Sequence, residues 1–97
     1  MVRIYVALDA GQLRQLAAGI RVTGPAFRAE TEDEEDEHAA LEEAASHGSV
    51  VAAADVRGAD DALTLDDVAS FHVDADGTGD LAWYATQEID AVLELVS

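Results

Sequence analysis

The chain has 97 residues, a length that fits one domain with a single modest core. Hydrophobic residues make up 49% of it but aromatic residues only 5%, so that core must be built from Ala, Val, Leu and Ile. The absence of cysteine excludes disulfides, thiolate catalysis and cysteine-ligated zinc. No apolar run has the length of a membrane span and no secretory leader opens the chain, so we expect a cytoplasmic protein without membrane contact.

Charge is the strongest feature of the composition. Five basic residues, all arginine, stand against 21 Asp and Glu, for a formal net charge of -16. Self-repulsion opposes folding in dilute buffer, whereas molar salt shortens the screening length to roughly 3 Å. This favours adaptation to a salt-rich cytoplasm; the alternative is an acidic surface that docks a basic partner or mimics nucleic acid. Direct binding of nucleic acid is not expected, because no Lys/Arg cluster is present to contact phosphates.

The first two elements follow from local patterns. Residues 2–8 alternate apolar and polar, which predicts a strand with one face on a core. Asp9 with Gln12 forms a capping-box pattern that starts a helix, and Gly19 is suited to end it. Residues 21–28 contain Gly24 and Pro25, so they form a loop or a short extended segment outside the centre of any sheet.

An acidic helix and two strands come next. Thr31 with Glu34 is a second capping-box pattern, it opens an acidic run, and Gly48 would end that helix. Residues 49–56 are short and nearly all apolar, as in a strand buried on both faces. Residues 68–74 alternate again and predict a further strand.

Residues 81–96 have apolar positions at helical spacing, and Asp80 can cap a helix there. The resulting order is β-α-(β)-α-β-β-α over a single domain, residues 1–97. We therefore expect an α/β (α+β) two-layer sandwich, with a small mixed sheet of three to four strands and about three helices.

Six stretches in this order are similar to a known family. They are "VRIYVAL", "VTGPAFR", "DEEDEHAAL", "VVAAADV", "LDDVASFHVDA" and "LAWYATQEI". The order resembles that of small proteins found mainly in actinobacteria, with relatives in haloarchaea, which have an RVYVP-like start, a VTPxLR-like segment, an acidic DEE helix and an LWYAxQEI-like helix. Gly24 is an insertion relative to that pattern. The resemblance implies one domain with these elements and carries no activity or cofactor.

The loop after residue 73 is a weak candidate for a metal site. Asp74, Asp76 and Asp80 supply carboxylates there, and the first part of the loop follows the EF-hand spacing. The match fails at position 12, where Ala85 stands in place of glutamate. A trio of His72 with the first two carboxylates is also conceivable, but the same spacing arises when a strand runs into a turn. We expect no metal and no cofactor.

On a helical wheel of residues 81–96, Trp83 lies nearly opposite the apolar stripe, beside Gln87, and Tyr84 borders the stripe. Trp83 either packs on its own chain or, with Tyr84 and Gln87, anchors a partner surface or a homodimer contact. Glu88 falls at the buried edge, where we expect Arg3 or, failing that, Arg21 to pair with it; solvation at the rim is the plain alternative.

No nucleophile or phosphate-binding motif is present, so the sequence favours a non-enzymatic protein–protein interaction module with an unidentified partner. The alternative is a small enzyme or a ligand- or metal-binding protein that uses His72 and nearby carboxylates.

The charge predicts a salt requirement for folding. In salt-free buffer the far-UV circular dichroism should show reduced structure, because carboxylate repulsion is unscreened. Molar KCl should restore the spectrum and raise the thermal midpoint by about 10 °C or more. Full structure with a cooperative transition in salt-free buffer would contradict the reading of the acidity as salt adaptation.

Overall fold

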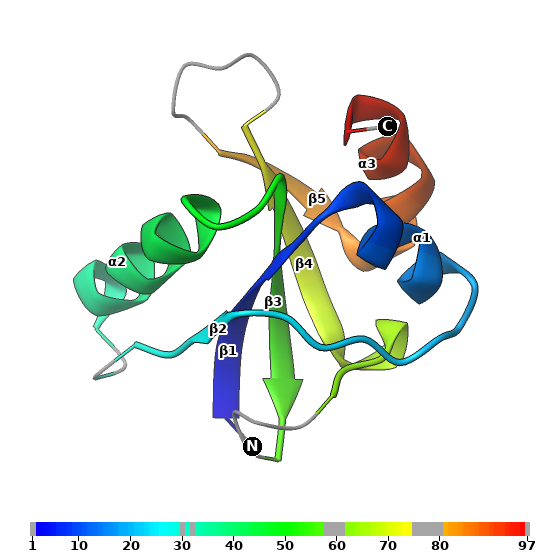
Figure 1. The fold of residues 1–97 in the computed structure, drawn as a ribbon. Helices are drawn as coiled ribbons and strands as arrows, with labels where there is room; N and C mark the ends of the chain where they lie inside the picture. Colours follow the sequence, from blue (N-terminus) through cyan, green and yellow to red (C-terminus); the bar gives the residue numbers. More distant parts are fainter. Residues whose placement is uncertain (1, 30, 32, 58–61, 75–80, 97) are drawn as a thin grey trace.

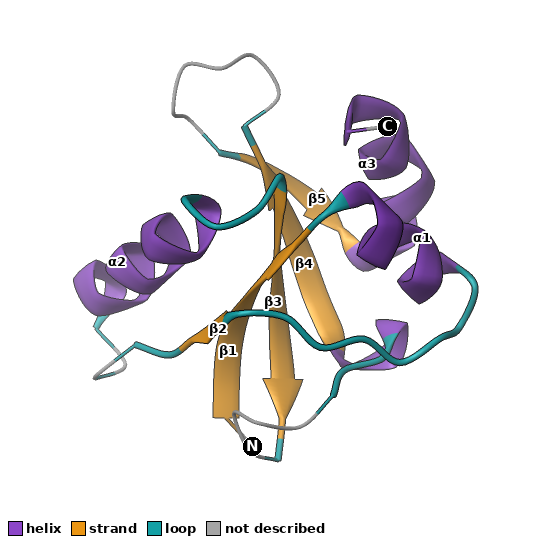
Figure 2. Cartoon of the chain, viewed as in Figure 1, coloured by secondary structure: helices purple, strands orange, loops and turns teal. Residues whose placement is uncertain are grey.

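The computed structural model describes residues 2–29, 31, 33–57, 62–74 and 81–96, which form an α+β domain. Five antiparallel strands lie in the order β2-β1-β3-β4-β5, with three α-helices packed on them (Figures 1 and 2). The elements are β1 Val2–Leu8, α1 Ala10–Ala17, β2 Ala26–Phe27, α2 Glu34–Ala45, β3 Val50–Val56, β4 Val68–Val73, β5 Ala82–Ala85 and α3 Ile89–Val96. Single 3-10 turns, Leu65–Asp67 and Thr86–Glu88, precede β4 and α3.

The architecture differs from the expected one in two respects. The sheet is antiparallel throughout and has five strands, where a mixed sheet of three to four was expected. The helices also lie on both faces, with α2 on one and α1 and α3 on the other, so the domain has three layers (Figure 1). Both faces are covered because the central strand, β3, is apolar at nearly every position and must be shielded on each side.

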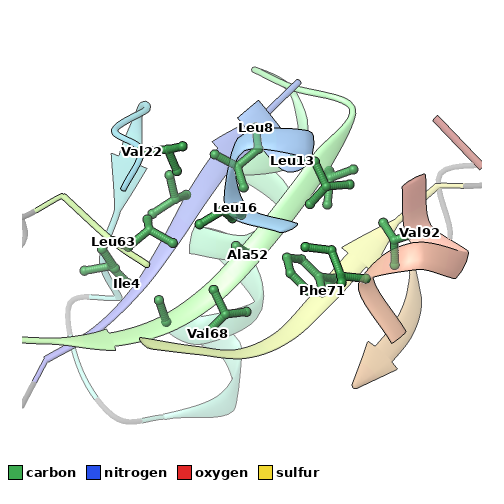
Figure 3. Close-up of a cluster of buried hydrophobic side chains, with 14 of the residues drawn as sticks. Ile4, Leu8, Leu13, Leu16, Val22, Ala52, Leu63, Val68, Phe71 and Val92 are labelled. Atoms are coloured by element: carbon green, nitrogen blue, oxygen red, sulfur yellow. The ribbon is translucent and has the colours of Figure 1, made fainter. Parts of the chain in front are cut away.

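Alternation along the strands divides the buried residues into two cores. The larger core lies under α1 and α3 and consists mostly of Ile, Leu, Val and Ala, together with the fully buried Phe71 (Figure 3). The smaller core lies under α2 and joins Tyr5, Val51 and Ala53 of the sheet to Ala40 and Ala44 of the helix. The small side chains of Ala40 and Ala44 let α2 approach the sheet closely.

Helix α1 begins and ends as predicted. The Asp9 carboxylate accepts from the Gln12 N–H at 2.7 Å, and the Gln12 side chain accepts from the Asp9 N–H at 3.0 Å. Gly19 has a φ of 82°, a left-handed conformation that costs little only for glycine. The capping pattern and the glycine therefore predicted this helix correctly.

Helix α2 starts later than predicted. Its cap position is Asp33, and Thr31 lies outside the helix, where its hydroxyl oxygen accepts from the Asp33 N–H at 3.1 Å. The Thr31 hydroxyl also bonds the Asp36 carboxylate. Four acidic residues occupy the first turn, Glu34 to Glu37, where the helix dipole favours negative charge.

The predicted helix over residues 81–96 is wrong in its first half. Residues 82–85 form β5, which pairs with β4 in the register His72↔Trp83, and α3 begins only at Ile89. Trp and Tyr favour a strand, and pairing with β4 satisfies the backbone of this segment. The Glu88 carboxylate accepts from the Ala85 N–H at 3.0 Å, which holds the turn between strand and helix. The proposed cap, Asp80, lies outside the described residues.

Close packing of β1 on the turn before β3 gives a test of the fold. A Cβ on Gly48 would lie 2.9 Å from the Leu8 carbonyl oxygen and 3.0 Å from its nitrogen, so Gly48→Ala forces backbone to move. We expect a loss of about 1–3 kcal/mol in the free energy of unfolding, measured by urea denaturation at high salt. The exposed neighbour provides a control: Ser49→Ala should stay within about 0.5 kcal/mol of the wild type. Equal midpoints for both variants would contradict this packing.

Candidate functional site

The face of the sheet that carries α2 is only partly covered. α2 packs on β1, β2 and β3 (Figure 1). On the same face, β4 and β5 present Ser70, His72 and Trp83 beyond the helix. Trp83 has 63% of its surface exposed, an unusual state for the largest side chain in the chain. An open strip of the sheet therefore lies between α2 on one side and Trp83 on the other.

A hollow of about 320 Å³ occupies that strip, and we call it the α2–β5 groove. One wall comes from α2, the floor from β1, β3 and β4, and the far wall from β5. Its lining residues are Arg3, Tyr5, Glu34, Glu37, His38, Leu41, Ala53, Ser70, His72 and Trp83. The volume is at the lower end of ordinary ligand pockets, which suits one or two side chains of a partner.

The floor of the groove carries a hydrogen-bonded pair. Ser70 Oγ lies 3.0 Å from His72 Nε2, and the two residues are two apart on β4, so they share a face. Burial, together with the nearby charge of Arg3, lowers the pKa of His72. The imidazole is therefore uncharged at neutral pH and offers hydrogen bonding without adding positive charge to the groove.

Arg3 is held at one end of the groove by its cross-strand neighbour. Its guanidinium donates to both oxygens of Asp55, at 2.8 and 3.1 Å, in the register that pairs β1 with β3. The hydrogen bond from Arg3 lowers the pKa of Asp55. The predicted pair of Arg3 with Glu88 does not form, because strand register supplies a nearer carboxylate and the Glu88 side chain bonds the backbone of residue 85.

Carboxylates dominate the helix wall. Glu34 and Glu37 line the groove, and the negative charge of Glu37 reaches both Tyr5 and Arg3. Burial raises the pKa of Tyr5, with a further contribution from Glu37, so the phenol remains protonated. His38 pairs with Glu42 at 2.9 Å on the exposed side of the same helix. The groove thus combines aromatic rings with carboxylates.

The three residues predicted as one partner surface do not share a face. Trp83 faces the groove, whereas Tyr84, its neighbour on β5, points to the opposite face and packs against the larger core. Gln87 is exposed in the 3-10 turn after the strand. A strand sends successive side chains to opposite faces, so replacing the expected helix by β5 separates them.

Tyr5 was not predicted as a site residue, and Arg3 was predicted only as a partner of Glu88. Both lie on the second face of the alternating strand β1, a face for which no packing partner was predicted. The apolar run of β3 already implied that this second face is covered. Combining those two patterns would have placed Tyr5 beside a second helix.

The metal candidates gain no support. Asp74 is exposed and lines a neighbouring hollow of about 300 Å³ that also includes His72, whereas Asp76 and Asp80 lie outside the described residues. Within the described ranges, no group of three His, Asp or Glu side chains is placed to hold a metal ion. The same ranges include no helix long and apolar enough to cross a membrane.

No family model matches the chain, and neither does a curated protein or a solved structure. The chemistry of the α2–β5 groove is therefore the ground on which a function is assigned.

Proposed function

We propose that this chain is a non-enzymatic protein–protein interaction module that binds a basic segment of another protein along the α2–β5 groove. The observation that carries the proposal is Trp83, 63% exposed on the part of the sheet face that α2 leaves open. Exposed tryptophans set in a hollow are typical anchors of protein interfaces. The net charge of -16 supports the further proposal that this module is adapted to a salt-rich cytoplasm.

The groove has the composition of an interface centre. Trp83, Tyr5 and Leu41 supply apolar and aromatic area, while Ser70 and His72 supply polar contacts on the floor. Interface cores are enriched in aromatic residues, with polar groups that fix the orientation of the partner. A partner segment lying between α2 and β5 would cover Trp83 without any rearrangement of the sheet.

Charge favours a different protein over a second copy of this chain. Each copy carries a net charge of -16, and a symmetric contact through the groove would bring Glu34 and Glu37 of one copy toward the same surface of the other. Like charges placed face to face cost free energy even where salt screens distant charges. A segment with Lys or Arg would instead place positive charge beside Glu34 and Glu37, and this attraction would favour binding.

Selection from a peptide library tests the proposal. Nine-residue peptides spanning a range of net charge are panned on the immobilised protein in 2 M KCl, and binders are synthesised for titration. We expect basic peptides whose binding moves the emission of Trp83, the single tryptophan, to shorter wavelength as water is excluded from the ring. Trp83→Ala should weaken the same peptides by about thirtyfold when followed by calorimetry.

Leu95 provides the matched control, because it is a large apolar side chain, 46% exposed, that does not line the groove. Leu95→Ala should leave peptide affinity unchanged. Binding that survives Trp83→Ala, or that falls equally in both variants, contradicts the proposal. Self-association of the wild type that Trp83→Ala abolishes would assign the surface to a homodimer instead.

A second candidate is a hydrolytic or ligand-binding use of His72, favoured by the 3.0 Å contact between Ser70 and His72. In an ester hydrolase Ser70 Oγ would attack the carbonyl while His72 Nε2 takes its proton. Ser70 is only 6% exposed, however, which limits access to its hydroxyl.

The two candidates differ in their reaction with activated esters. We expect p-nitrophenyl acetate to be hydrolysed no faster by the wild type than by Ser70→Ala or His72→Ala, followed by release of p-nitrophenol. Peptide binding should persist in Ser70→Ala. Turnover that both substitutions abolish in folded protein would favour the enzyme over the interaction module.

A further inference from the structure

Building on the proposed function, we propose that the α2–β5 groove is a seat for one guanidinium group, contributed by an arginine of the partner, which stacks on Trp83 and pairs with Glu37. This names the residue that the groove recognises, where the proposed function names only a basic segment.

Strand register sets the size of the seat. Tyr5 pairs with Ala53, which pairs with Ser70, and Trp83 pairs with His72 one row along the same face. From β1 to β5 there are three strand spacings, about 14 Å. The small side chains of Ala53 and Ser70 between the two rings leave the hollow open at its centre.

The lining favours a cation. The faces of Tyr and Trp rings are electronegative and attract a positive charge placed over them. Glu34 and Glu37 add formal negative charge, and neither takes part in an ion pair with another described residue. Arg3, the one guanidinium in the lining, is already held by both oxygens of Asp55, and His72 is uncharged at neutral pH. The helix wall of the groove is therefore negatively charged.

A guanidinium fits this lining better than an ammonium group. It is planar, so it can stack on the indole of Trp83 and keep the N–H groups at its edge free to pair with the Glu37 carboxylate on the helix wall of the groove. It is also more weakly hydrated than an ammonium group, so it leaves water more readily and survives competition from molar K⁺.

Amino-acid probes isolate the contact. The ¹⁵N-labelled protein is titrated in 2 M KCl with N-acetyl-arginine amide, and separately with the citrulline and lysine analogues, while amide and indole N–H shifts are recorded. Citrulline keeps the shape of arginine but has no charge. We expect the arginine probe to shift the Trp83 indole and the amides of Ser70 and His72, with citrulline about tenfold weaker and lysine between them.

A matched pair of variants separates the seat from diffuse attraction by the acidic surface. Glu37→Gln should weaken the arginine probe about fivefold, because it removes the carboxylate in the groove. Glu35→Gln removes the same charge from the same turn of α2 at an exposed position outside the lining, and should leave the affinity unchanged. Equal shifts from arginine and citrulline, or equal weakening by the two variants, overturn the seat.

A peptide selected for binding to the groove separates failure of the seat from failure of the proposed function. If its affinity depends on Trp83 but not on replacing its arginines with citrulline, the seat is overturned and the interaction module stands. If no peptide depends on Trp83 while the arginine probe still shifts the groove and responds to Glu37→Gln, the seat stands and the interaction module fails.

Discussion

Burial of β3 on both faces is the constraint on which the rest of the structure depends. A strand reading VVAAADV offers no polar face, so helices must cover both sides of the sheet at its centre. Its three alanines keep the layers close: Ala52 and Ala54 face the core under α1 and α3, and Ala53 faces α2, which meets it with alanines of its own. α2 is twelve residues long and packs on the β1–β3 side, so coverage stops before β4 and β5. The open strip that holds Trp83 is therefore a consequence of how the centre of the sheet is shielded.

Local sequence patterns correctly predicted the elements that depend on interactions between residues close in the chain. The capping box of Asp9, the left-handed Gly19 and the alternation of β1 each depend on neighbours a few residues away, and each was predicted correctly. β5 was missed because its backbone is satisfied by β4, a partner that no local pattern names. The apolar positions of residues 81–96 fit helical spacing, but the first of them lie in β5. A strand of four residues is too short to distinguish a helical period from a strand period, so the match there arose by chance. The bond from the Ala85 N–H to Glu88 holds the turn after β5, and the bond from the Thr86 hydroxyl to the Val68 carbonyl ties that turn to β4; both are likewise visible only once these elements are placed.

In the candidate site, too, some features could be predicted from local sequence patterns and others depend on distant parts of the chain. A helical wheel set Trp83 apart from the apolar stripe, but Trp83 lies on strand β5, and it is exposed because α2 does not cover that part of the sheet. Its neighbours in space could not be derived in the same way, because they come from β1, α2 and β4, between ten and eighty residues away along the chain. The pairing of Arg3 is similar, since cross-strand register rather than charge pattern chose Asp55 over Glu88. Side-chain chemistry was readable from the sequence, whereas the grouping of side chains required the topology.

Acidity acts differently over the whole surface and inside the groove. With a screening length of roughly 3 Å in molar salt, the net charge of -16 cannot attract a partner from a distance or distinguish one basic protein from another. Charges retain their effect where a partner touches them and excludes water and ions, and that condition is met beside an apolar ring. Glu37 lies in a hollow with Trp83 and Tyr5, whereas most of the carboxylates face solvent. In molar salt, the recognition that we propose would depend on carboxylates that lie beside aromatic side chains, and the groove brings Glu37 together with Trp83 and Tyr5.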